Sequence, residues 1–165
     1  MAQRTDLSTT RNLGWALAVV LRRWHEGVED VLKDVPQGSR GYQVLSTVVH
    51  EQLPTQVALA AHLSIDRTVM TYLIDELEGD GLVERRPDPA DRRARRIVAT
   101  ARGRKVLAAA ERRVAAVEDV ILSGLSADEQ AAFQDLTQRA ATHIHHEDPN
   151  ADPCTAVRQV FDQAN

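Results

Sequence analysis

Apolar side chains recur every three or four residues over residues 8–34, which is the period of an amphipathic helix. The residues that form this apolar stripe are Leu13, Leu17, Val20, Leu21, Trp24, Val28 and Val31. Trp15 falls nearly opposite the stripe on the same helical wheel, beside Val19. The predicted helix therefore has two apolar surfaces, and we expect it to pack against a second partner.

Capping and breaking residues divide this part of the chain. Ser8 or Thr9 is expected to cap the first helix, and Pro36 and Gly38 are expected to end it. Ser39 is then predicted to cap a second helix, whose apolar positions are Tyr42, Leu45, Val48 and Val49.

Two short helices with a tight turn between them are predicted next, over residues 56–63 and 66–78. Thr55 and Asp66 stand where N-caps are needed, and Ser64 lies in the turn. Inward contacts that fix the angle of the pair are expected from Leu59, Leu63, Ile65, Met70, Leu73, Ile74 and Leu77. This helix-turn-helix leaves the following residues on its outer face: Arg67, Thr68, Thr71 and Tyr72.

A β-hairpin and two long helices complete the pattern. Residues 82–86 and 95–100 are predicted to be strands around a turn-rich excursion, which places a wing beside the second short helix. Helical periodicity returns at Ala101, and a capping box at Ser126 precedes another helix. The fold class is therefore mainly α, a winged helix-turn-helix with long flanking helices that form a dimerisation region.

Four parts of the chain follow from these elements. We assign residues 1–38 to an N-terminal dimerisation helix, 39–100 to the winged DNA-binding region, and 101–146 to C-terminal dimerisation helices. Residues 147–165 form a tail, for which both a short helix and disorder remain open.

Charge is strongly segregated along the chain. Its 165 residues carry a net charge of -4, yet residues 83–105 contain nine basic and three acidic side chains, a local charge of +6 that leaves -10 elsewhere. Electrostatic recognition depends on local fields, so an acidic protein with one basic hairpin suits a polyanion that it meets with that face.

Several classes of protein are disfavoured by what the sequence lacks. It has no apolar run of membrane-spanning length and no leader-like N-terminus, so we expect a cytoplasmic protein. Cys154 is the single cysteine, which excludes an intrachain disulfide. No phosphate-binding loop, nucleophile motif or metal-binding pair with a general base is present, and we expect neither an enzyme nor a cofactor.

The order of helices and wing resembles the multiple-antibiotic-resistance regulator (MarR) family over residues 8–146. The segment TQVALAAHLSIDRTVMTYLIDELEGDGLVERR is similar to the family's helix-turn-helix, and DPADRRARRIVATARGRKVL is similar to its wing, with Asp91, Arg93, Thr100 and Gly103 matching the pattern. The resemblance implies a transcription regulator, with repression as the usual action. Whether an operator is repressed or activated depends on its position relative to a promoter.

Three positions depart from the family pattern. Ser64 stands where glycine is frequent, Tyr72 where an arginine that contacts DNA is common, and Asp66 where a small polar residue is usual. A carboxylate caps amides but repels phosphate, so we do not expect Asp66 to touch DNA.

The second short helix is expected to enter the major groove, where every base pair presents a distinct pattern. Arg67 suits guanine or phosphate, Thr68 and Thr71 suit phosphate or a thymine methyl, and Tyr72 donates its hydroxyl. The alternative is that these residues are a solvated helix face.

Arginines of the wing fit the narrow minor groove, which concentrates negative potential. Arg92 and especially Arg93 are predicted to enter it, and by resemblance Asp91 orients a wing arginine. Phosphate contacts are expected from Arg86, Arg95 and Arg96. A solvated basic face is again the alternative.

Two partners besides double-stranded DNA are expected. A two-fold homodimer would present two recognition helices to grooves about 34–36 Å apart, and the long helices have apolar surface to spare for its interface. By resemblance, a small anionic or aromatic effector is expected to bind between these helices and the winged module, near Arg11, Trp15, His25, Tyr42 and His50. Packing across the dimer is the alternative for Trp15, and surface or core positions are the alternative for both histidines.

Three other interpretations stay open at this point. His143, His145 and His146 are compatible with a metal-responsive regulator, although histidines are favoured at a helix C-terminus without any metal. Cys154 is compatible with a redox-responsive regulator. A winged-helix module that holds a protein partner differs from a DNA binder in having no base preference.

Overall fold

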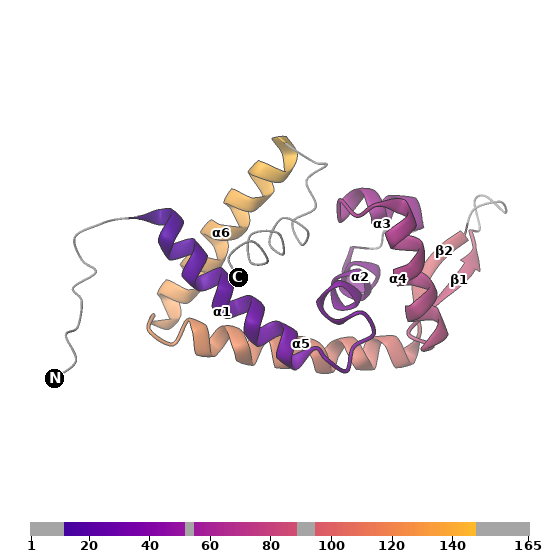
Figure 1. Ribbon diagram of the computed structural model, residues 1–165, viewed down its shortest axis with the longest axis horizontal. Coiled ribbons are helices and arrows are strands. Elements are labelled where there is room, and N and C mark those ends of the chain that lie inside the picture. The colour runs from indigo at the N-terminus through magenta and orange to yellow at the C-terminus, as the bar shows by residue number, and fades with distance from the viewer. Residues whose placement is uncertain (1–11, 52–54, 89–94, 148–165) are drawn as a thin grey trace, which may run out of the picture.

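The computed structural model describes residues 12–51, 55–88 and 95–147. It is mainly helical with one two-stranded antiparallel sheet, as predicted. The elements in chain order are α1 (Leu13–Val31), α2 (Gly38–His50), α3 (Gln56–His62), α4 (Arg67–Gly79), β1 (Val83–Pro87), β2 (Arg95–Ala99), α5 (Ala101–Ile121) and α6 (Ala127–Glu147). Figure 1 shows α2, α3, α4 and the hairpin gathered at one end of α5, with α1 and α6 at the other end.

The helix-turn-helix begins and ends where its capping residues predict. The Thr55 hydroxyl accepts a hydrogen bond from the Ala58 amide at 3.2 Å, which caps α3. The Asp66 carboxylate accepts from the Thr68 amide at 2.7 Å and caps α4. Between the two helices Ser64 has a φ of +51°, a left-handed conformation that explains why glycine would suit this position. The two helices are therefore separated by a turn with a defined geometry.

The predicted caps of the first two helices differ from the structure. Asn12 caps α1 by accepting from the Trp15 amide at 3.0 Å, whereas Ser8 and Thr9 lie outside the described residues. Ser39 does not cap α2, because the helix already begins at Gly38. The Ser39 hydroxyl instead donates to a Glu29 carboxylate oxygen at 2.5 Å, so that it joins α2 to α1.

The winged module has a continuous apolar core. It is built from the inward faces of α2, α3 and α4, the two strands and the start of α5, and its largest fully buried members include Leu45, Leu59, Met70, Ile74, Leu77, Leu82 and Leu107. The strands pair with Val83 opposite Ala99. The order of elements and the hairpin position match the prediction of a wing beside α4.

The N-terminal end of α5 is pressed against the wing. A Cβ atom added to Gly103 would lie 2.0 Å from the Leu82 carbonyl oxygen, a distance that no side chain tolerates. The Thr100 hydroxyl accepts from the Gly103 amide at 2.9 Å and donates to the Gly81 carbonyl at 2.7 Å. Thr100 and Gly103 match the family pattern, and this close approach is a physical reason for both.

The other end of the molecule is much less covered. A small second core of Val28, Leu32, Val35, Ala110 and Val114 holds α1 against α5. No residue that the structure describes in α6 is buried. The apolar side chains left exposed on α1 and α6 include Leu13, Leu17, Leu21, Leu136 and Ile144. Across the described ranges, no helix is both long and apolar enough to cross a membrane.

Candidate DNA-binding interface and effector region

One face of α4 is free of packing while the opposite face is buried. Met70, Leu73, Ile74 and Leu77 point into the winged core, each at most 3% exposed. The four predicted recognition residues are all exposed on the outer face, and these are Arg67, Thr68, Thr71 and Tyr72. Tyr72 is the most prominent apolar side chain of this face, at 69% exposed. The structure therefore presents the predicted recognition residues together, at the N-terminal half of a capped helix.

The base of the wing is tied to α4 by Arg85, which the sequence analysis did not single out as a site residue. Its guanidinium lies 2.5 Å from an Asp75 carboxylate oxygen and is paired with Glu78 as well. The Arg85 amide also donates to Glu78 at 2.9 Å. Burial disfavours the charged form of Arg85, but the hydrogen bonds to Asp75 and Glu78 outweigh it and raise the pKa. Arg85 is thus a half-buried cation that ties β1 to two carboxylates of α4.

Gln56 is a second residue that the sequence analysis missed. Its side-chain amide donates to the Thr71 hydroxyl at 2.7 Å, and its carbonyl oxygen lies 3.5 Å from the Arg85 guanidinium. Sequence spacing gives no signal for these contacts, because they join segments 15 and 29 residues apart. Gln56 therefore connects α3 to both α4 and the wing.

The predicted phosphate-contacting arginines lie on the strands of the wing. Arg86 is exposed and lies 2.5 Å from Glu84 on the same strand. Arg95 is exposed at the start of β2, and the Arg96 guanidinium lies 3.9 Å from the Asp88 carboxylate. The predicted minor-groove residues Arg92 and Arg93, and also Asp91, lie outside the described residues. Of the described arginines here, Arg86 and Arg96 are both screened by carboxylates of the hairpin.

The predicted effector residues are only partly brought together. Tyr42 is half-buried and packs against both apolar cores. The His50 Nε2 atom lies 2.7 Å from a Glu111 carboxylate oxygen, so that His50 joins α2 to α5. His25 is half-buried on α1. Tyr42, His50 and His25 are therefore carried by the helices that meet between the winged module and the long helices.

Trp15 and Arg11 do not join this group. Trp15 is 52% exposed at the start of α1. It precedes Val28, where α1 is buried, by 13 residues, which is about 20 Å along a helix axis. Arg11 lies outside the described residues. Within one protomer, the effector region predicted from sequence is therefore reduced to His25, Tyr42 and His50.

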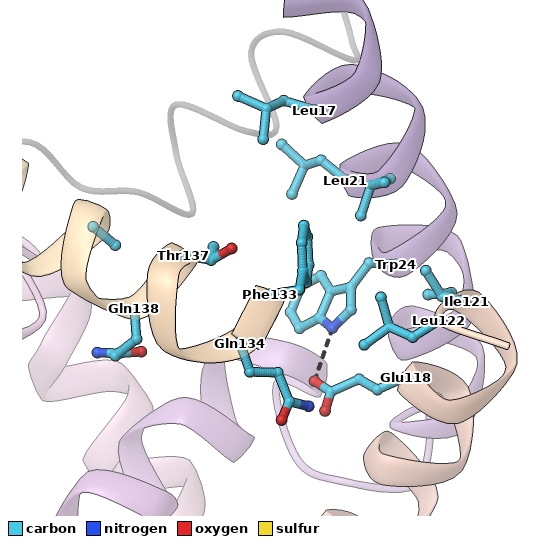
Figure 2. A pocket seen from close by; sticks show the side chains of 12 residues that line it. Leu17, Leu21, Trp24, Glu118, Ile121, Leu122, Phe133, Gln134, Thr137 and Gln138 are labelled. Carbon is cyan, nitrogen blue, oxygen red and sulfur yellow. Dashed lines mark hydrogen bonds between the residues drawn. The ribbon is translucent and has the colours of Figure 1, made fainter. Parts of the chain in front are cut away.

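Two carboxylates of α5 that the sequence analysis overlooked face this region. Burial raises the pKa of the Tyr42 phenol, and the negative charges of Glu111 and Glu118 raise it further. The indole nitrogen of Trp24 donates to Glu118 at 3.2 Å (Figure 2). Glu111 and Glu118 are seven residues apart on one helix, and that spacing was the available signal that they share a face.

A cavity lies between α1, α5 and α6, and Glu118 contributes to its wall (Figure 2). Its volume is about 590 Å³. The wall is mostly apolar, from Leu17, Val20, Leu21, Trp24, Ile121, Leu122, Phe133 and Ala141, with Glu118, Gln134, Thr137 and Gln138 as polar members. Of the predicted effector residues that the structure describes, none lines this cavity.

The histidines of α6 form no metal-binding cluster within the described residues. His143 lies 3.4 Å from Glu147, an i,i+4 pair on an exposed helix surface. Cys154 lies outside the described residues, so the redox interpretation has no geometry to support it.

Comparison with known proteins decides the family. The model of the MarR family matches residues 40–94, which include most of α2, the whole helix-turn-helix and strand β1. The transcriptional regulator HosA of Escherichia coli O111:H- is 33% identical over 117 residues, which cover 71% of this chain and 82% of HosA. The chain belongs to the MarR family. It is accordingly a transcriptional regulator of the DNA-binding, winged-helix kind.

Solved structures of MarR-family proteins share the fold. CouR from Rhodococcus jostii RHA1, bound to p-coumaroyl-CoA, is 32% identical with a TM-score of 0.66, over 79% of this chain and 92% of CouR. A MarR-family protein of Mycobacterium tuberculosis in complex with DNA is 25% identical with a TM-score of 0.65, over 79% of this chain and 98% of its own. One relative therefore holds a ligand and another holds DNA.

Proposed function

We propose that this MarR-family regulator binds a palindromic operator as a homodimer and responds to a small effector, most often as a repressor. In each protomer α4 enters the major groove and the wing reaches the adjacent minor groove. The observation that carries the proposal is the outer face of α4, where Arg67, Thr68, Thr71 and Tyr72 are exposed above a fully buried opposite face.

We assign a function to three of the four parts predicted from the sequence. Residues 39–100 read DNA, and residues 1–38 and 101–146 hold the two protomers together. The exposed leucines of α1 and α6 and the apolar cavity of about 590 Å³ between them support this assignment. Exposed apolar patches of this kind mark protein interfaces, and a second copy of the same helices has a matching apolar surface.

The proposed effector is a small anionic or aromatic compound that binds between the long helices and the winged module. The p-coumaroyl-CoA bound to CouR supports an aromatic effector by similarity. Here Tyr42 and His50 lie on α2. Tyr42 packs against the winged core, and His50 pairs with Glu111 on α5. Titration with phenolic acids tests the proposal: tryptophan fluorescence and operator affinity should both change, and the absence of both changes would contradict it.

The decisive experiment for the DNA proposal is selection of duplexes from a random pool by the purified protein. We expect a palindrome with half-sites about one helical turn apart, because a two-fold dimer presents two equivalent α4 helices. Affinity for it should fall steeply between about 50 and 200 mM salt, since phosphate contacts release counterions. A protein-interaction module, the alternative function, would enrich no sequence.

Substitution of one recognition residue then tests the assignment of α4. Arg67→Ala should weaken operator binding by about 10-fold to 100-fold, the range for loss of one good contact to a base edge. Lys33→Ala removes the same charge from an exposed site on the segment between α1 and α2, and should leave affinity nearly unchanged. Equal affinities for Arg67→Ala and the wild type would contradict the proposed role of Arg67.

A further inference from the structure

The hydroxyl group of Thr71 is already engaged within the protein. It donates to the backbone carbonyl of Arg67 at 2.9 Å and accepts from the side-chain amide of Gln56 at 2.7 Å. A hydroxyl has one proton to donate, and that proton is directed into the helix. The exposed Thr71 side chain therefore has no proton to give to a phosphate oxygen, and what it still presents to a ligand is its methyl group and one lone pair of the hydroxyl oxygen.

Contacts from outside α4 fix this orientation. Gln56, the first residue of α3, holds the Thr71 oxygen, and its own carbonyl oxygen lies 3.5 Å from Arg85. Arg85 is in turn held by Asp75 and Glu78 on α4. Rotation of the Thr71 side chain about χ1 would break both hydrogen bonds of its hydroxyl. The rotamer is therefore set by a chain of contacts from the wing base through α3 to the recognition helix.

We propose that Thr71 reads a thymine in each operator half-site through its methyl group, and that Gln56 is the positioning residue that keeps the methyl group directed outward. The C5-methyl of thymine lies in the major groove and is recognised there by apolar contact. This inference rests on the proposed DNA-binding function, and it replaces the open choice between phosphate and thymine for Thr71 with one partner.

The test removes the methyl group from the DNA instead of from the protein. Deoxyuridine replaces thymidine at one position after another in the selected operator, which leaves base pairing and charge unchanged. For the wild type we expect one position per half-site where affinity falls about fourfold, and about 15-fold when both half-sites are changed, the effect of one methyl group lost from a buried contact.

Two matched variants separate the methyl group from the hydroxyl. Thr71→Val keeps a methyl group in place and removes the hydroxyl, so it should still distinguish thymidine from deoxyuridine. Thr71→Ser keeps the hydroxyl and removes the methyl group, so it should bind both operators equally. Thermal melting of each variant checks that the fold is intact; if Thr71→Val does not fold, Thr71→Ser decides, and full discrimination by that variant overturns the proposal.

Gln56→Ala tests the positioning role through the ratio between the affinities for the thymidine operator and the deoxyuridine operator. The variant should bind the two operators with a ratio nearer to one, because the Thr71 side chain then keeps only its hydrogen bond to the Arg67 carbonyl and is held less firmly in one rotamer. A merely structural role for Gln56 would weaken both operators by the same factor and leave the ratio unchanged. That outcome would remove Gln56 from the proposal.

The two proposals fail in different ways. If the wild type enriches no duplex at all, the DNA-binding mode proposed for α4 is wrong. If it binds a selected operator tightly but no thymidine can be distinguished from deoxyuridine, operator binding stands and the role of Thr71 is wrong. The role of Thr71 is equally wrong if Thr71→Ser discriminates and Thr71→Val does not.

Discussion

The winged module and the long helices use their apolar residues in opposite ways. Among the described residues, the winged core gathers 16 buried side chains, whereas the core that joins α1 to α5 has five. On α1 and α6, large apolar side chains remain exposed, among them Leu17 at 48% and Leu136 at 60%. The winged module has a complete core within one chain, whereas the flanking helices leave an apolar face uncovered. Folding and assembly should therefore be separable by mutation.

The largest effect is expected from a charge placed on the uncovered face. Leu17→Glu should dissociate the proposed dimer, raising its dissociation constant by roughly 100-fold or more, because a carboxylate without a partner would have to be buried in the interface. Sedimentation velocity at micromolar concentration measures the oligomeric state.

Val57→Glu is the matched control for this substitution, because Val57 is equally exposed, at 54%, but lies on α3 of the winged module. It should leave the dimer intact. A stable Leu17→Glu dimer, or a monomer in both variants, would show that the apolar face of α1 is not a specific interface.

The next effect is expected in the winged core. Leu77 is fully buried on α4. Leu77→Ala should lower the free energy of unfolding by about 2–5 kcal/mol, the range for a large side chain truncated in a packed core. Chemical denaturation measures this loss, and sedimentation of the folded variant should still report the wild-type oligomeric state. If Leu77→Ala kept the wild-type free energy of unfolding but became a monomer, folding of the winged module and assembly of the long helices would not be separable by mutation.

The smallest effect concerns the cap of α4. Hydrogen bonds from the Val69 and Thr68 amides lower the pKa of Asp66 below its ordinary value of 3.8. A carboxyl whose pKa is lowered by folding contributes stability above its unfolded pKa and loses it as the pH falls through the lower, folded pKa. Asp66→Asn keeps the cap without this titration.

Melting temperatures of the wild type and Asp66→Asn should therefore differ most at neutral pH and converge as the pH falls below 3.8. Asp128, in the first turn of α6, is the matched site for Asp→Asn, since it lies outside the winged module. A constant difference between the wild type and Asp66→Asn from pH 7 to pH 2 would show that the ionised carboxylate adds nothing to the cap.

Helix boundaries could be predicted where the residue that sets them is adjacent in the sequence. Thr55 and Asp66 cap the helices that immediately follow them, so α3 and α4 begin where the sequence indicates. The same rule gave a wrong prediction for Ser39, because α2 begins one residue earlier, at Gly38, and the Ser39 hydroxyl bonds to Glu29 on α1 instead.

Contacts between residues far apart in the chain could not be predicted from the sequence. Gln56 and Arg85 act through partners brought near by folding, and periodicity carries no information on such pairs. The sequence analysis assigned Tyr42 and His50 to the predicted effector region, which stays a prediction, but it did not point to Glu111 and Glu118 of α5 near them. In the sequence both are ordinary charged positions of a helix, and their contacts arise only because folding places α5 against α2 and α1.

The seating of Gly103 against Leu82 makes α5 a rigid lever between the wing and the apolar cavity. The Arg104 guanidinium adds a hydrogen bond to the Ala99 carbonyl at 2.7 Å, so the wing and the start of α5 move as one body. Its 21 residues span about 31 Å at 1.5 Å per residue. A tilt of about 5° at the cavity end would therefore carry the wing end about 3 Å, enough to break a hydrogen bond. In the proposed dimer, such a tilt would change the distance between the two α4 helices although it starts at the end of α5 that lies farthest from the wing.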